Sequence, residues 1–118
     1  MNEYKRLKNV FKLSHKVSLY IPSLRPDGKD IPGRDKIVND GRKLLSKLFG
    51  GCTTTRAIGS WILKTGKLQN EKITLLYSFA KELTPESIDQ ILDYCLEVKK
   101  IGNQESVSLE LDGELHFI

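Results

Sequence analysis

Few residues in this 118-residue chain have the types and spacing of a catalytic site. The sequence contains no GxGxxG, GxxxxGK[ST], HExxH or GxSxG motif, and nothing in it indicates a cofactor. Two histidines, His15 and His116, lie far apart without a carboxylate pattern beside either. Glu71 stands out because strand alternation predicts that it shares the helix-covered side with Ile73. A small hydrolase that uses Glu71 with a hydroxyl or a metal is therefore one alternative.

The cysteines and the hydropathy pattern predict a cytoplasmic protein. Cys52 and Cys95 have neither CxxC nor metal-type spacing, and each falls beside apolar residues. Both are therefore predicted to be buried free thiols in a reducing compartment. No apolar signal-peptide region and no apolar run of 18 residues is present, so a membrane partner is not expected.

The positive charge is concentrated at the N-terminus. Residues 1–16 contain five of the 19 Lys and Arg residues but one of the 15 Asp and Glu residues, which leaves 14 of each sign in the remaining chain. Residues 101–118 carry four acidic side chains and no Lys or Arg. We expect the basic head and the acidic tail to satisfy each other, within one chain or between two. A weak nucleic-acid binder that uses residues 1–16 is the alternative.

The stretch from residue 50 to residue 79 predicts a β-hairpin. Gly50 and Gly51 end an apolar-periodic helix, and Thr65-Gly66 separates two β-rich runs at 52–63 and 67–80. A two-residue turn at Thr65-Gly66 pairs Ile58 with Ile73 and Arg56 with Leu75. It also predicts that the line Ile73, Leu75, Tyr77 and Phe79 points toward the helices.

The other elements alternate along the chain. Helices are predicted from an Asp35 cap to Phe49 and from Thr84-Pro85 to Gly102. A short helix capped by Asn2 is predicted at the N-terminus. The predicted strands besides the hairpin cover residues 16–22, residues 107–111 and the chain end at Ile118. A turn over Leu111-Asp112 with Gly113 as the bulge residue pairs Leu109 with Leu115 and Val107 with Phe117.

This order predicts an α+β fold. Strand, helix, strand, strand, helix, strand is the order of the ferredoxin-like βαββαβ sandwich, here with an extra C-terminal strand and a short N-terminal helix. The length suits a single domain over residues 1–118. Residues 1–15 form its basic helix or arm, and residues 16–118 form its α+β core.

In this topology the sheet face without helices is the candidate binding surface. In the predicted register this face collects small hydroxyls, two large aromatic rings and one cation. Its candidate ligand- or partner-binding residues are Ser18, Tyr20, Thr55, Trp61, Lys72, Thr74, Ser106 and Ser108. Such a face suits a homodimer contact, or a platform for a flat or phosphorylated ligand. A partly exposed sheet face without a partner is the third alternative.

Several segments resemble a known group of proteins. The strings VSLYIPS, KLFGGCTTT, GSWI, GKLQNEKITLLYSFA and NQESVSLELDGELHFI are similar to small orphan proteins of plasmids, phages and cassette elements in low-GC Gram-positive bacteria. The resemblance covers most of residues 17–118 except the loop at 23–36. It implies an accessory protein that acts on host systems by binding. We therefore predict a non-catalytic, homo-oligomeric binding protein, a dimer, that recognises a host protein or a small anionic, nucleotide-like ligand.

Overall fold

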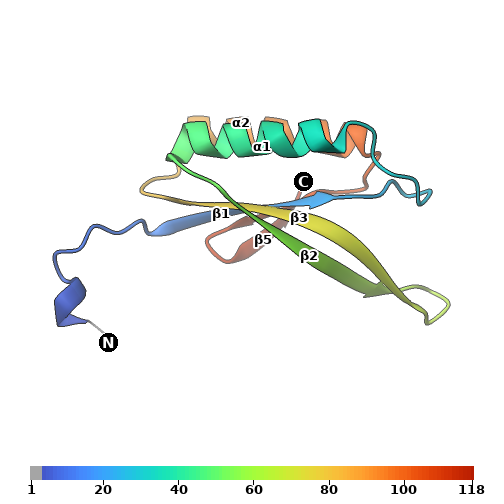
Figure 1. Cartoon of the computed structure of the whole chain (residues 1–118), viewed down its shortest axis with the longest axis horizontal. Helices are drawn as coiled ribbons and strands as arrows, with labels where there is room; N and C mark the ends of the chain where they lie inside the picture. The colour runs from blue at the N-terminus through green and yellow to red at the C-terminus, as the bar shows by residue number, and fades with distance from the viewer. Residues whose placement is uncertain (1–3) are drawn as a thin grey trace.

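The computed structural model describes residues 4–118, which form a sheet with both helices on one of its faces (Figure 1). All strand pairs are antiparallel, in the order β2-β3-β1-β4-β5. The elements are η1 (Lys5–Leu7), β1 (His15–Pro22), α1 (Arg34–Phe49), β2 (Thr53–Ile62), β3 (Leu68–Ala80), α2 (Pro85–Ile101), β4 (Ser108–Leu111) and β5 (Glu114–Phe117). The predicted α+β class and the extra C-terminal strand are confirmed. The five-stranded order is not the canonical ferredoxin order of four strands, because β5 extends the sheet beyond β4.

Both helices begin and end at residues that suit helix termini. The Thr84 hydroxyl caps α2 by accepting the Ser87 backbone N–H at 3.1 Å, and Pro85 occupies the first turn. Helix α1 ends at Gly50, whose φ of 87° is the left-handed conformation that glycine tolerates best. Its first residue is Arg34, so the predicted cap at Asp35 is wrong by two residues, and Gly33 occupies the cap.

The core lies between the helices and the middle of the sheet. Leu19 of β1, Leu76 of β3, Leu45 of α1 and Ile91 of α2 are all fully buried there. Gly41 allows α1 to approach closely, because a Cβ atom at this position would lie 2.6 Å from the Tyr94 hydroxyl. Close packing therefore explains a glycine in the middle of a helix.

The β2–β3 hairpin has a different register from the predicted one. Lys64, Thr65 and Gly66 form a three-residue loop, in which Gly66 has a φ of 85°. Ile58 therefore pairs with Lys72, and the predicted pairing of Ile58 with Ile73 is wrong. Because a slip of one residue reverses the faces, Ile73, Leu75, Tyr77 and Phe79 lie on the open face of the sheet instead of under the helices.

The C-terminal hairpin also differs from its prediction by one residue. Asp112 and Gly113 both have positive φ values, 52° and 85°, which form a two-residue turn. Leu109 therefore pairs with His116, and the predicted pair of Leu109 with Leu115 is wrong.

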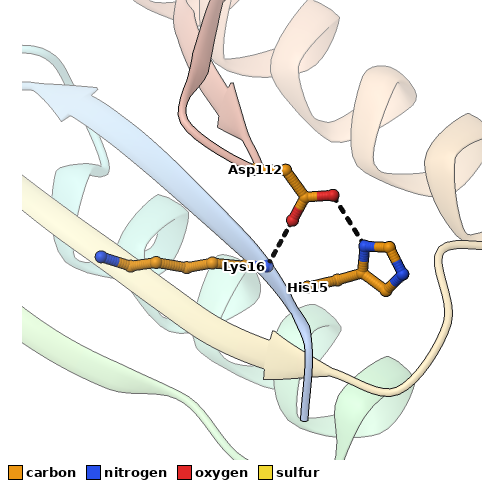
Figure 2. A network of polar contacts seen from close by, with 3 residues as sticks. All are labelled: His15, Lys16 and Asp112. Atoms are coloured by element: carbon orange, nitrogen blue, oxygen red, sulfur yellow. Dashed lines mark hydrogen bonds and ion pairs between the residues drawn. The ribbon is translucent and has the colours of Figure 1, made fainter. Parts of the chain in front are cut away.

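The N-terminal segment extends away from the sheet (Figure 1). The predicted cap Asn2 lies outside the described residues, and the turn that follows is the three-residue η1 instead of a longer helix. Residues 4–12 are exposed, and none of them forms a hydrogen bond or an ion pair with the acidic hairpin. The connection to that hairpin is made instead by His15 and Lys16, which both contact Asp112 (Figure 2). None of the helices in the described part of the chain is long and apolar enough to span a membrane.

Candidate functional site

The open face of the sheet carries aromatic rings and carboxylates in two separate pairs, Trp61 with Glu71 and Tyr20 with Glu110. Strand alternation and the observed pairings place Tyr20 of β1, Trp61 of β2, Glu71 of β3 and Glu110 of β4 on this face. Trp61 retains an exposed fraction of 45%. Aromatic rings and carboxylates are the groups that bind organic cations, through the ring faces and through charge.

Glu71 is held in place by the backbone at the end of β1. Its Oε2 accepts the N–H of Ser23 at 2.9 Å and that of Leu24 at 3.1 Å. Its partner across the hairpin is Gly59, which has no side chain, and Trp61 lies one pair further along the same face. The prediction that Glu71 lies on the helix-covered side is therefore wrong, because the loop has three residues.

Tyr20 and Glu110 form a second contact on this face. The Tyr20 hydroxyl donates to Glu110 Oε1 at 3.4 Å. Burial and the neighbouring Glu110 carboxylate raise the pKa of Tyr20, so its hydroxyl stays protonated at neutral pH. The adjacent Ser18 is 1% exposed, and its Oγ has no hydrogen-bond partner among the described residues.

Aromatic side chains continue along the same face toward the start of β1. The rings of Tyr77 and Phe79 meet edge to face, with centroids 6.0 Å apart. Lys16 Nζ lies 4.8 Å from the centroid of Tyr77 and 5.9 Å from that of Phe79. A cation already lies over aromatic rings here, which illustrates the kind of interaction that the open face offers.

The structure divides the sequence-predicted site residues into three groups. The open face holds Ser18, Tyr20, Thr55, Trp61 and Ser108. The predicted placement of Lys72 and Thr74 on that face is wrong, because the register places both on the side of the helices. Ser106 precedes β4 and lies in the connection from α2.

The sequence did not predict a hollow that lies on the helix side of the β2–β3 hairpin. It has a volume of about 910 Å³, and α1 and the two hairpin strands line it. Arg34, Arg42 and Arg56 join Lys72 around it. The spacing of eight residues between Arg34 and Arg42 could have indicated a shared helix face, but Arg56 could be placed there only with the correct register.

Among the described residues, neither the two cysteines nor the His, Asp and Glu side chains form a site for thiol or metal chemistry. Cys52 and Cys95 are both free, as predicted, although only Cys95 is fully buried. Burial raises the pKa of Cys95 to about 11, which makes it a poor nucleophile at neutral pH. Within residues 4–118, no group of three or more His, Cys, Asp or Glu side chains could hold a metal ion.

The chain shares its fold with solved structures of a phage enzyme. A phage SAM lyase in complex with S-methyl-5′-thioadenosine matches 92% of this chain and 94% of its own, with a TM-score of 0.64 and 16% identity. A phage SAM lyase in the apo state matches 94% of this chain and 93% of its own, with a TM-score of 0.61 and 14% identity. No family model matches the chain, and no curated protein matches it either.

These matches overturn the main functional prediction. The sequence led us to expect a non-catalytic binding protein, but the fold over nearly the whole chain is that of a SAM-cleaving enzyme. The prediction that the chain is not an enzyme is therefore corrected. The matched proteins come from phages, which agrees with the resemblance to proteins of mobile elements. One of them binds a small adenosine derivative, which agrees with the nucleotide-like character of the predicted ligand but not with its negative charge.

Proposed function

We propose that this protein cleaves S-adenosylmethionine and releases S-methyl-5′-thioadenosine. The observation that carries the proposal is the fold match to a phage SAM lyase over 92% of this chain and 94% of that one. The aromatic rings and carboxylates on the open face support it independently, since the sulfonium and the ammonium of the substrate are both cations. This surface chemistry suits S-adenosylmethionine better than an anionic ligand.

The products define which bond breaks. The sulfonium sulfur of S-adenosylmethionine carries a methyl group, the adenosyl group and the aminocarboxypropyl group. Release of S-methyl-5′-thioadenosine breaks the bond from sulfur to Cγ of the aminocarboxypropyl group, and the sulfur keeps the electron pair as a neutral thioether. A lyase does not use water, so the electrons come from the substrate itself. Either its carboxylate attacks Cγ and closes a lactone, or Cβ loses a proton and an alkene forms.

The change in charge during this reaction suggests different roles for the carboxylates and the rings. The positive charge at sulfur disappears as the bond breaks, so a carboxylate beside the sulfur would stabilise the substrate more than the transition state. We therefore place Glu71 at the ammonium group, whose charge does not change. Glu110 lies opposite Ser18, level with Tyr77 and about 20 Å along the sheet from Glu71, too far to bind the same ammonium. Glu71 positions the aminocarboxypropyl group, while Trp61, its neighbour on the same face, packs against the adenosyl group and the sulfonium.

A second copy of the chain would complete this site. Exclusion of water favours a reaction in which opposite charges disappear, but the open face is accessible in one chain, with Trp61 45% exposed. Apolar side chains are also exposed at the edge of the sheet, among them Phe117 of β5, which is 70% exposed. We propose that the chain acts as one domain in a homo-oligomer, in which a neighbour covers the open face.

Product analysis in ¹⁸O-labelled water tests the proposed reaction. The purified protein is incubated with S-adenosylmethionine, and the products are identified by mass spectrometry. We expect S-methyl-5′-thioadenosine together with a lactone or an alkene that contains no ¹⁸O at Cγ. Homoserine with ¹⁸O in its side-chain hydroxyl would identify a hydrolase instead. Recovery of intact S-adenosylmethionine would contradict the proposal altogether.

A further inference from the structure

The hollow between α1 and the β2–β3 hairpin is lined by four cationic side chains. Arg34 and Arg42 come from α1, Arg56 from β2 and Lys72 from β3, and Asp35 is the one acidic residue of its lining. The ion pairs among residues 4–118 are His15 with Asp112 and Lys36 with Asp40, so none of these four cations takes part in one. The hollow therefore carries a net charge of about +3 without compensation from the described chain.

Neutral groups hold two of the guanidinium groups in position. Arg34 Nη2 donates to Thr74 Oγ1 at 2.9 Å, while its Nε is buried without a partner among the described residues. Arg42 Nε donates to Thr54 Oγ1 at 2.9 Å, and its Nη1 donates to Asn39 Oδ1 at 2.7 Å. These acceptors orient the guanidinium groups but leave their charges in place. A guanidinium has five N–H donors, so donors remain on both side chains for a ligand.

The arrangement fits a compact anion with several charges. Like charges around one hollow repel each other, and an anion removes that repulsion. Guanidinium groups bind phosphate with two parallel hydrogen bonds, which makes arginine suited to phosphate recognition. Val38 and Ile58 add apolar surface to the lining, and a hollow of about 910 Å³ is large enough for a nucleotide.

We propose that this hollow binds the phosphates of a nucleoside diphosphate or triphosphate. The net charge of the lining is close to that of such a ligand, and the cations converge on one hollow instead of following a stripe, as a nucleic-acid backbone would require. The site lies on the opposite side of the hairpin from Glu71 and Trp61. Its cations would repel the sulfonium and the ammonium of S-adenosylmethionine, so the two sites take different ligands and the proposal does not rest on the proposed lyase activity.

Calorimetric titration with ATP in low salt tests the site. The test variant is Arg56→Gln with Lys72→Gln, because both side chains are exposed and their loss leaves the core intact. The matched control is Lys47→Gln with Lys100→Gln, which removes the same charge from exposed helix positions outside the hollow. Circular dichroism establishes that both variants are folded.

We expect saturable binding of ATP to the wild-type protein and the control, and binding weakened about 10-fold or more in the test variant, since one tenfold step corresponds to about 1.4 kcal/mol. Pyrophosphate should compete with ATP, and S-adenosylmethionine should not. Absence of ATP binding, or an equal loss in both variants, would overturn the proposal. Binding of a DNA duplex at this site without binding of ATP would also overturn it. Loss of lyase activity has no bearing on these results.

Discussion

The carboxylate of Glu71 on β3 accepts the backbone N–H of Ser23, just beyond the end of β1, at 2.9 Å. This hydrogen bond and the one from Leu24 fix one oxygen of the carboxylate. A fixed carboxylate on a surface that also contains Trp61 is suited to hold the ammonium group of a substrate in one orientation.

Glu71→Gln tests this positioning role. Glutamine keeps an oxygen that can accept the backbone N–H groups but removes the negative charge. We expect the KM for S-adenosylmethionine to rise about 10-fold or more, because a hydrogen bond to a charged group contributes about 1.5–3 kcal/mol. Steady-state kinetics of S-methyl-5′-thioadenosine release measure the change. Glu97→Gln, on the exposed side of α2, is the matched control and should behave like the wild type. An unchanged KM in Glu71→Gln would show that Glu71 does not bind the substrate.

Trp61 is the one tryptophan of the chain, so its fluorescence reports directly on the open face. We expect S-methyl-5′-thioadenosine to change the intensity or the emission maximum of Trp61 in a saturable titration, because the ligand replaces water at the ring. Inosine serves as the control ligand, since it lacks the thiomethyl group and the adenine amino group. Binding detected by calorimetry without any change in Trp61 fluorescence would place the ligand elsewhere.

The sequence predicted the helices of this protein better than the pairing of its strands. The helices were predictable because caps and glycines determine their ends locally, as Thr84 and Gly50 do. The positions of the strands were predictable from the alternation of apolar and polar residues, but the residue pairs between neighbouring strands were not. Thr65 is β-branched and disfavours a positive φ, so the loop uses Gly66 alone in the left-handed conformation and has three residues. The predicted two-residue turn therefore placed every side chain of β3 on the wrong face of the sheet relative to β2.

The opposite error occurred at the C-terminal hairpin. Asp-Gly is a favourable sequence for a two-residue turn, and Asp112-Gly113 forms one. The bulged turn predicted from the sequence keeps apolar side chains paired, as in Leu109 with Leu115. That preference does not apply here, because β5 is exposed along its whole length and no buried face constrains its pattern. The candidate site depended on these registers, so Lys72 and Thr74 were predicted on the wrong face. No local motif in the sequence indicates the proposed lyase activity.

Gly41→Ala should lower stability although alanine is the better helix former. The new Cβ would lie 2.6 Å from the Tyr94 hydroxyl and 2.8 Å from Leu76 Cδ1. We expect an overpacking cost of about 1–3 kcal/mol, which outweighs the roughly 1 kcal/mol gained in helix propensity. Thermal unfolding measures the difference. Ser46→Ala, at an exposed position of the same helix, is the control. An unchanged or higher Tm for Gly41→Ala would show that α1 can move away from the sheet at little cost.

Asp112 should make the stability depend on pH in the acidic range. Its pKa is lowered, first by the hydrogen bond with His15 and then by the Lys16 backbone N–H (Figure 2). A lowered pKa contributes stability above the carboxyl group's ordinary pKa, and this stability is lost as the pH falls through the value in the folded protein. Asp112→Asn keeps a residue that tolerates the positive φ. We therefore expect the difference in Tm between wild type and Asp112→Asn to shrink toward zero as the pH falls below the ordinary pKa of an aspartate, about 3.9. A constant difference from pH 7 to pH 2.5 would contradict this account.

Turnover of S-adenosylmethionine by catalytic amounts of protein tests the proposed activity most directly. The protein is mixed with about a 100-fold excess of S-adenosylmethionine, and S-methyl-5′-thioadenosine is quantified by liquid chromatography over time. The spontaneous decay of S-adenosylmethionine in buffer is subtracted. We predict many equivalents of S-methyl-5′-thioadenosine per chain for the wild type and the Glu97→Gln control, with reduced release at subsaturating substrate for Glu71→Gln. Release at the rate of spontaneous decay, with S-adenosylmethionine recovered intact, would contradict the assignment of this protein as a lyase.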